Sequence, residues 1–228
     1  MNSQVERVLQ MALIDKKDFE LSLSELNLHE VIEQAVGNFS LQVERRDGIL
    51  RTDLQASNPV IEGDLTQLRQ VIHNLVQNAL DAVEQRPDGL VQVITETARN
   101  DGGELRAVRL RVSDNGGGFG DKVMKRAFEP YVTTKPKGTG LGLAVVKKIA
   151  DEHGARVRIV NRRADAPAGP DGVPGEGPVI GAQVSLSFSR FAQVKSLAPG
   201  QTLHASDMPA TASPPNPAPA TAPGAAQG

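Results

Sequence analysis

The sequence has no cysteine and no tryptophan, and aromatic residues make up only 3% of its 228 positions. The absence of cysteine excludes disulfides, thiol chemistry and thiolate-bound zinc, and it fits a cytosolic compartment. The core must therefore rest on leucine, valine, isoleucine and alanine. A net charge of −2 with a pI near 6.1 gives no signature of nucleic-acid binding, so we expect no nucleic acid among the partners.

Long apolar runs are also missing. None approaches the ~18 residues that a membrane-spanning helix needs, and no signal peptide is visible. We therefore expect a cytoplasmic polypeptide, whose full-length parent could still carry membrane helices upstream of residue 1. Residues 209–228 hold six prolines, seven alanines and no charge, which predicts a disordered tail with either no role or a partner-binding one.

Glycine, by contrast, is concentrated in two turns about twenty residues apart, at 114–120 (DNGGGFG) and 138–143 (GTGLGL). The first follows an alternating strand pattern at 108–112, so Asp114 leaves a strand end and can accept a hydrogen bond from an exocyclic amine. The second opens a helical stripe, which aims backbone N–H groups at an anion. Either turn alone is compatible with an ordinary hairpin, but the pair predicts a nucleotide pocket.

A third element is the amphipathic helix expected over residues 64–83. Its apolar positions recur at steps of three and one. Its polar face carries amides, among them Asn74 and Asn78, which are four residues apart and so lie on one face. A solvated face normally favours Glu and Lys over Asn, because Asn is a poorer helix former. The amides therefore predict ligand contact, and an Asn carbonyl oxygen suits Mg²⁺ bridging phosphates.

These segments resemble the sequence boxes of sensor histidine kinases. Residues 74–82 resemble the N box, 114–120 the first glycine box, 128–131 (FEPY) the F box and 138–143 the second glycine box. All four occur in the family's order, and "NALDA" and "FEPYVTTK" resemble its nitrogen-regulation subgroup. The resemblance covers about residues 25–190 and implies the Bergerat ATP-binding fold, a two-layer α/β sandwich with a mixed, mostly antiparallel sheet covered on one face by helices.

The resemblance also implies roles for particular residues, with ATP and Mg²⁺ as cofactors. Asp114 is expected to accept the adenine amine, and Gly116 and Gly118 to shape the turn beside the ring. Ser185 falls where the family often has a threonine near the adenine. Asn78 is expected to bind Mg²⁺, with Asn74 assisting at phosphate or metal.

Phosphate binding is expected from the second glycine loop and from the lid between the loops. The loop residues expected to contact phosphate are Gly138, Thr139, Gly140, Leu141 and Gly142. Lys135 and Lys137 on the lid could reach the β- or γ-phosphate, or could be merely solvated.

One departure from the family's sequence pattern indicates the type of reaction. ATP-hydrolysing relatives carry a Glu where this chain has Asn74, and an amide cannot act as a general base. This favours phosphoryl transfer to a histidine over hydrolysis. Of the four histidines, His29 with Glu30 looks superficially like the start of the family's phosphoacceptor box, but the residues that follow and its position do not fit. We therefore expect the phosphoacceptor histidine upstream of this chain. The alternatives are a Bergerat-fold ATPase, an anti-sigma-type Ser/Thr kinase or a non-catalytic binding module.

The expected organisation has three parts. Residues 1–20 resemble the end of a dimerisation helix, or form a helix that packs on its own domain. Residues 21–190 form the catalytic domain with a lid at 119–137, and 191–228 form the tail. Expected partners are the dimerisation and phosphoacceptor domain of the same protein, a second copy in a homodimer and a response-regulator receiver domain.

The expected elements are helices near 28–46, 64–86 and 141–153, strands near 49–54, 59–62, 90–97, 105–113, 156–161 and 181–188, and a disordered loop at 164–178.

Overall fold

The computed structural model describes residues 21–43, 49–133, 135, 138–168 and 174–190. These belong to a first compact unit, Met1–Ala192, and the second unit, Gln193–Gly228, lies outside the described residues, as does the predicted dimerisation helix. The helices are α2 (Leu28–Gly37), α3 (Ser40–Val43), α4 (Leu65–Ala82), α5 (Asp121–Met124) and α6 (Gly142–Glu152). The strands are β1 (Ser24–Asn27), β2 (Leu50–Leu54), β3 (Val60–Gly63), β4 (Val91–Arg99), β5 (Leu105–Asp114), β6 (Arg156–Ala168) and β7 (Pro174–Phe188).

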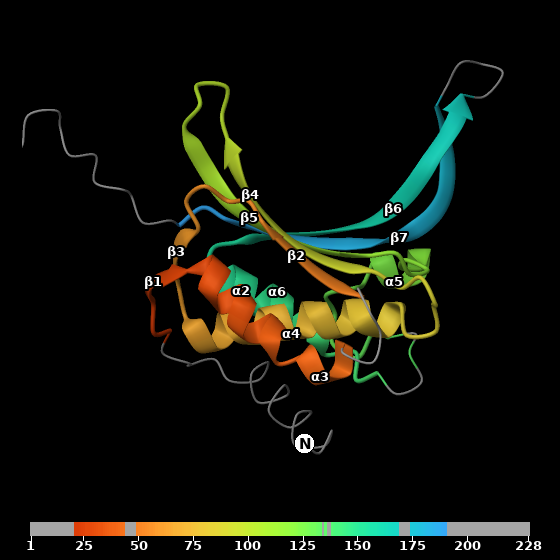
Figure 1. Cartoon of the computed structure of the whole chain (residues 1–228), viewed down its shortest axis with the longest axis horizontal. Coiled ribbons are helices and arrows are strands. Elements are labelled where there is room, and N and C mark those ends of the chain that lie inside the picture. The colour runs from red at the N-terminus through yellow and green to blue at the C-terminus, as the bar shows by residue number, and fades with distance from the viewer. Residues whose placement is uncertain (1–20, 44–48, 134, 136–137, 169–173, 191–228) are drawn as a thin grey trace, which may run out of the picture. The chain divides into compact units, whose positions relative to one another are not determined.

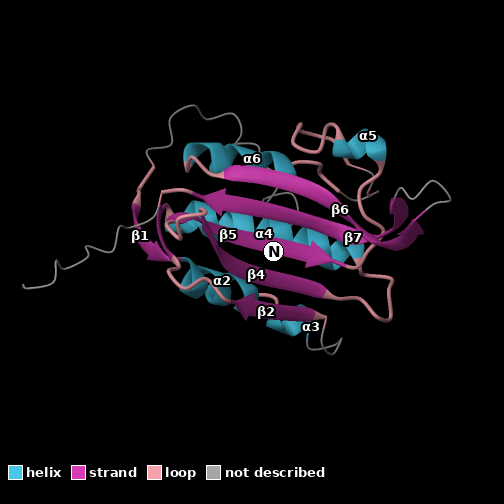
Figure 2. Ribbon diagram, turned by 90° about the horizontal axis from the view of Figure 1, so that it is seen from above, coloured by secondary structure: helices cyan, strands magenta, loops and turns pink. Residues whose placement is uncertain are grey.

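Five strands form one sheet in the order β2-β4-β5-β7-β6. Strands β2 and β4 pair in parallel and the other neighbours pair antiparallel, while β1 and β3 form a separate two-stranded ribbon. Helices α2, α4 and α6 cover one face of the sheet, and the β4–β5 and β6–β7 hairpins rise on the other side (Figure 1; Figure 2). This confirms the predicted two-layer sandwich with a mixed, mostly antiparallel sheet.

The core lies between the helices and the covered face of the sheet. Helix α4 begins where the side chain of Asp64 accepts bonds from Thr66 N and Gln67 N, and it buries the predicted apolar stripe. Strand β5 buries every second side chain, including Leu110 and Val112, against that stripe. The same alternation fixes which side chains of each strand face the helices and which face away.

Two expectations about the elements were wrong. The helix expected over 28–46 ends at Gly37, since α2 is capped at Asn38 and only the short α3 follows. The loop expected over 164–178 is largely strand, because β6 and β7 continue pairing to Ala168 and Pro174 through register shifts. Bulges accommodate the proline and glycine that a regular ladder would reject, and a Cβ at Gly177 would collide with Ala164 O.

His153, which follows α6, is a buried core residue. Its ring is 1% exposed, Nε2 accepts a bond from Asp64 N at 2.9 Å, and Nδ1 bonds to Ile149 O at 2.8 Å. Within the described part of the chain, no helix is long and apolar enough to cross a membrane.

Candidate functional site

A cavity of about 480 Å³ opens between α4, the start of α6 and the ends of β5 and β7. This size is ordinary for a small-molecule site, which spans roughly 300–1,000 Å³. Its walls combine apolar groups from the sheet with amides from α4 and backbone from both glycine loops. The lining residues that the sequence singled out are Asn74, Asn78, Asp114, Gly118, Lys135, Gly138, Thr139, Gly140 and Gly142.

Asp114 lies at the end of β5 and is 7% exposed. Its Oδ1 accepts bonds from Gly116 N at 2.8 Å and Ala182 N at 3.2 Å. Among the described residues Oδ2 receives no hydrogen bond, so it can accept one from a ligand. Burial raises the pKa of the Asp114 carboxyl, against the two backbone bonds and the charges of Arg162 and Lys135, which lower it.

The first glycine loop is tied to other elements by two asparagines that the sequence analysis missed. Asn115 accepts a bond from Leu90 N and donates one to Asp88 O, both at 2.8 Å. Asn161 on β6 accepts from Phe119 N and donates to Phe119 O, again at 2.8 Å each. An asparagine inside a strand is unusual, and that was the only available signal for Asn161.

The asparagines of α4 play different parts. The side chain of Asn74 is 5% exposed; it accepts a bond from Gln70 Nε2 at 3.0 Å and donates one to Gly142 O at 3.3 Å. Asn74 therefore ties α4 to the start of α6. The side chain of Asn78 makes no hydrogen bond within the described residues, and a Cβ at Gly142 would lie 3.4 Å from its Nδ2. Asn78 is thus the amide that is free to meet a ligand.

The second glycine loop leads into α6 through a close backbone crossing. Gly140 has φ +68°, and a Cβ there would lie 2.6 Å from the carbonyl carbon of Tyr131. Tyr131, with φ +66°, donates its N–H to Gly140 O at 2.9 Å. Thr139 Oγ1 accepts from Leu141 N at 3.3 Å. Only glycine fits at position 140, because it tolerates both the positive φ and the crossing chain.

Lys135 connects the lid to α4. Its Nζ lies 2.9 Å from Asp81 Oδ2 and donates to Asn78 O at 3.3 Å. Asp81 also lines the cavity, so the lid places a lysine beside an acid at the cavity wall. Lys137, the other predicted phosphate contact, lies outside the described residues.

The structure does not bring three predicted residues to the cavity wall. Ser185 pairs with Arg111 and Arg158 in the sheet and lines a hollow on the opposite face; its neighbour Val184 lines the cavity instead. Leu141 is 1% exposed and packs inward. Gly116 sits against α4, where a Cβ would lie 2.6 Å from the main-chain oxygen of Ala82, so its lack of a side chain allows the loop to pack there.

Comparison with known proteins points to one family. The profile of the family described as "Histidine kinase-, DNA gyrase B-, and HSP90-like ATPase" matches residues 63–190. Sensor protein RprX of Bacteroides fragilis is 35% identical over 161 residues, which are 68% of this chain and 30% of RprX. The chain spans about a third or less of the length of the curated relatives it matches.

Solved structures with the same fold include the catalytic domain of histidine kinase ThkA. It is 26% identical with a TM-score of 0.58, covering 74% of this chain and 96% of that one. Full-length ShkA in complex with AMPPNP is 25% identical with a TM-score of 0.61, covering 83% and 36%.

The fold and the cavity define an ATP-binding α/β sandwich domain. The chain belongs to the family of histidine kinase-, DNA gyrase B- and HSP90-like ATPases.

Proposed function

We propose that the chain is the ATP-binding catalytic domain of a two-component sensor histidine kinase. It transfers the γ-phosphate of ATP to a histidine on a dimerisation and phosphoacceptor domain, from which a response-regulator receiver domain takes it. The proposal places the domain in the cytoplasm, as part of a homodimeric protein. The observation that carries it is a cavity with an acid at one end and a glycine loop that opens α6 at the other.

Asp114 would accept the adenine amine through Oδ2, while its Oδ1 stays bonded to the loop. Val112, Ala182 and Val184 supply apolar wall near this end. The triphosphate would then extend toward Gly140 and α6, whose N-terminal N–H groups favour an anion. The wall therefore changes from apolar to donor-rich along the cavity, as a nucleotide requires.

The residues present fit a Mg²⁺ ion held partly by the nucleotide. The described residues contain no cluster of three or more His, Cys, Asp or Glu side chains that could cage a metal on its own. Asn78 offers a free amide oxygen on the cavity wall, and Mg²⁺ commonly uses one or two protein oxygens together with phosphates and water. Bound there, the ion would neutralise charge on the phosphates.

Asn74 supports transfer over hydrolysis. Both ends of its amide are used in bonds to Gln70 and Gly142, and an amide takes no proton from water at neutral pH. Phosphoryl transfer depends mainly on positioning and charge neutralisation, so a nucleophilic histidine can accept the phosphoryl group without a base on this domain. The alternative ATPase would need a group that the described cavity wall does not hold at this position.

The test is binding of a fluorescent ATP analogue with and without Mg²⁺, for the wild type and for Asn78→Ala, together with transfer in trans. The dimerisation and phosphoacceptor domain, a helical hairpin, is expressed separately and added with labelled ATP. Acid-labile, base-stable phosphate on this hairpin is then measured. We expect Mg²⁺-dependent binding that Asn78→Ala weakens, and phosphohistidine on the hairpin. Steady phosphate release without transfer would favour the ATPase, and absence of nucleotide binding would leave a non-catalytic binding module.

A further inference from the structure

The face of the sheet that no helix covers carries two cross-strand rows of arginine and serine. In register, Arg111 on β5 pairs with Ser185 on β7, which pairs with Arg158 on β6. The adjacent row is Arg109, Ser187 and Arg156. Neighbouring strands lie about 4.8 Å apart. We call these six residues the arginine trough, because small serines on the middle strand lie between long arginines on both sides.

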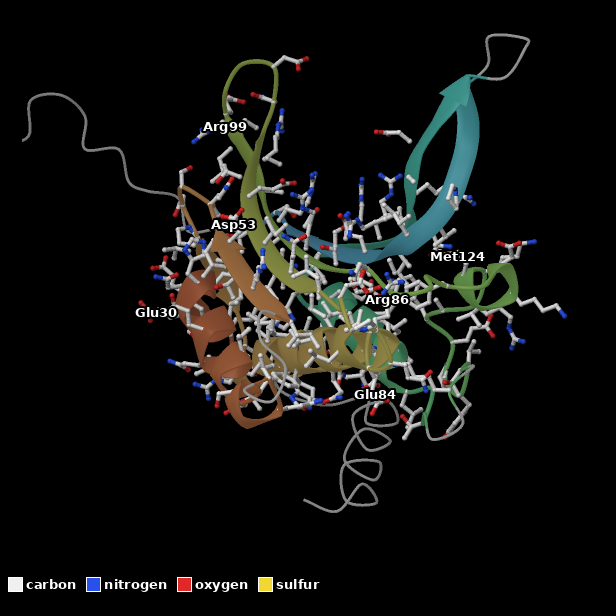
Figure 3. All side chains as sticks on the ribbon, turned by 45° about the vertical axis from the view of Figure 1, so that its right-hand side comes forward. Glu30, Asp53, Glu84, Arg86, Arg99 and Met124 are labelled. Carbon is white, nitrogen blue, oxygen red and sulfur yellow. The ribbon has the colours of Figure 1, made fainter. Side chains whose placement is uncertain are left out.

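The trough is a hollow rather than a flat surface. Its six residues line a depression of about 800 Å³ on the face opposite the nucleotide cavity. The β4–β5 and β6–β7 hairpins rise on either side of this face (Figure 1), and Figure 3 shows side chains with nitrogen tips standing between them. The depression exists because β7 presents Gln183, Ser185 and Ser187 outward and Ser189 follows just after the strand, so no large side chain from this segment fills it.

Positive charge in the trough exceeds the acid that meets it. Glu96 bridges Arg109 at 2.7 Å and Arg111 at 3.1 Å. In the part of the chain that the structure describes, Arg156 and Arg158 have no ion pair, and Nε of Arg111 is buried without a hydrogen-bond partner. Four guanidinium groups around one carboxylate leave donors that an incoming anion could satisfy.

The chemistry of the lining selects among anions. No aromatic residue is among the described residues that line the hollow, so it offers no stacking platform for a nucleobase. The two rows are two residues apart along each strand, or about 6.6 Å, which is also the spacing of alternate side chains on one face of an extended peptide. Carboxylates at positions i and i+2 of such a peptide would each meet one row.

We propose that the arginine trough binds an acidic polypeptide segment of a partner protein, in extended conformation, with Asp or Glu at alternate positions. Arg156 and Arg158 provide the unpaired charge, Ser185 offers a hydroxyl in the middle of its row, and Arg109 and Arg111 share their donors between Glu96 and the incoming carboxylates. This partner surface is separate from the nucleotide cavity, because it is built from the other face of the same strands.

The test uses the whole chain and a labelled peptide of alternating Glu and Ser, with binding followed by fluorescence anisotropy at low and moderate salt. Arg156→Gln with Arg158→Gln is compared with a double variant of equal charge change away from the trough, Arg69→Gln with Arg86→Gln, both exposed on the wild type. We expect the first double variant to weaken peptide binding by about tenfold or more, and the second to leave it nearly unchanged. Nucleotide-analogue binding and the circular-dichroism melting curve show that each variant is folded.

Equal weakening in both double variants would mean nonspecific attraction and would overturn the proposal. So would failure of the wild type to bind the Glu-Ser peptide at low salt. If a Gln-Ser peptide of the same length bound equally well, the carboxylates would not be what the trough recognises, and the proposal would be overturned. Stronger binding of anionic phospholipid vesicles or of a short single-stranded oligonucleotide, lost in the trough variant, would replace the acidic segment with that ligand.

Discussion

The two glycine loops of the cavity are held in different ways. The first loop is bonded to three separate parts of the fold: Asn161 of β6, the backbone of β7 at Ala182, and the segment after α4 through Asn115. The described bonds of the second loop are mostly local, between Tyr131 and Gly140 and between Lys135 and Gly138. Its described side-chain ties to α4 are the bond from Asn74 Nδ2 to Gly142 O and, through the adjoining lid, the contacts of Lys135 with Asp81 and with Asn78 O.

This difference matches what each end of a nucleotide needs. Adenine is a rigid planar ring, and the Asp114 carboxylate is already held in place by backbone hydrogen bonds. Binding therefore orders few groups and costs little entropy. The phosphate end must admit a triphosphate and release a diphosphate, and a loop with few ties to the core can rearrange at low free-energy cost. We therefore expect damage to the first loop to appear in stability, and damage to the second to appear in phosphate recognition.

The sharpest comparison is between Gly118→Ala and Gly140→Ala. Both residues have positive φ, but a Cβ at Gly118 would lie 2.5 Å from Val179 Cγ1, inside the folded β6–β7 pair. We expect Gly118→Ala to lower the free energy of unfolding by about 2–4 kcal/mol, from αL strain plus overpacking. A Cβ at Gly140 would also clash, at 2.6 Å from the carbonyl carbon of Tyr131, but Tyr131 belongs to the lid and not to the sheet. We therefore expect Gly140→Ala to cost less stability and to lower affinity for ATP more than affinity for adenosine. Denaturant unfolding and calorimetric titration measure the two effects.

Gly117→Ala and Gly120→Ala are the matched controls. Neither glycine has positive φ, and a Cβ at either would meet nothing within 4 Å. Both variants should stay close to the wild type in stability. If Gly118→Ala proved as stable as these controls, the first loop would not be the rigid one and the comparison would fail.

Asp114→Asn should separate binding from stability within the first loop. An asparagine Oδ1 can keep both bonds to Gly116 N and Ala182 N, but Nδ2 then meets the adenine amine donor to donor. We expect ATP affinity to fall by between about ten- and a hundredfold, as for loss of a charged acceptor. Asp121→Asn, at an exposed position on α5, removes the same charge and should change little.

The pH dependence has a definite sign. Burial raises the pKa of the Asp114 carboxyl in the folded protein, so its protonated form favours folding at low pH and that contribution is lost as pH rises through the raised pKa. Asp114→Asn should therefore melt at an equal or higher temperature than the wild type at neutral pH. ATP affinity of the wild type should fall as the pH drops through the same pKa. A melting temperature well below that of the wild type would contradict this account.

Asn161→Asp tests the bond pair that fixes the first loop. The variant keeps an acceptor for Phe119 N but replaces the donor to Phe119 O with a carboxylate oxygen that faces a carbonyl. We expect it to lower the free energy of unfolding by about 1–2 kcal/mol, and Asn161→Ala to do the same. Hydrogen exchange of the amides at 116–119 should quicken in both. Unchanged exchange there would show that β6 does not hold the loop.

The sequence predicted the parts of the site that depend on local pattern. The apolar stripe of α4 has a strong period, and the covered face of β5 follows from its alternation. Asn78 and Asp114, which the sequence singled out, both line the cavity. Ser185 was placed one residue out of phase. In a strand a shift of one residue moves a side chain to the other face, and the register of β7 puts Val184 at the cavity.

Other features depend on contacts between distant segments. The bond between Asn161 and Phe119 joins residues 42 positions apart, and no periodicity predicts it. Likewise the proline and glycine content of 164–178 indicated a loop. The bulged pairing that makes these residues strand depends on the opposing strand, which local composition does not reveal. Fold class was therefore predictable from local pattern, whereas the rigidity of the first loop was not.

The smallest expected effect concerns the ion pair between Lys135 on the lid and Asp81 on α4. Asp81→Asn removes the ion pair with Lys135 but keeps an oxygen for Gln77 Nε2, which donates to Asp81 Oδ1 at 2.7 Å. Both partners are more than a third exposed, so the free energy of unfolding should change by about 1 kcal/mol or less. Asp81 lines the cavity, so loss of its charge should raise ATP affinity a few-fold and release Lys135 toward the phosphates. The gain should shrink at high salt, because exposed charges are screened. In Lys135→Met the same Asp81→Asn change should bring a smaller gain, since no lysine remains to be released; an equal gain would show that Lys135 does not reach the phosphates.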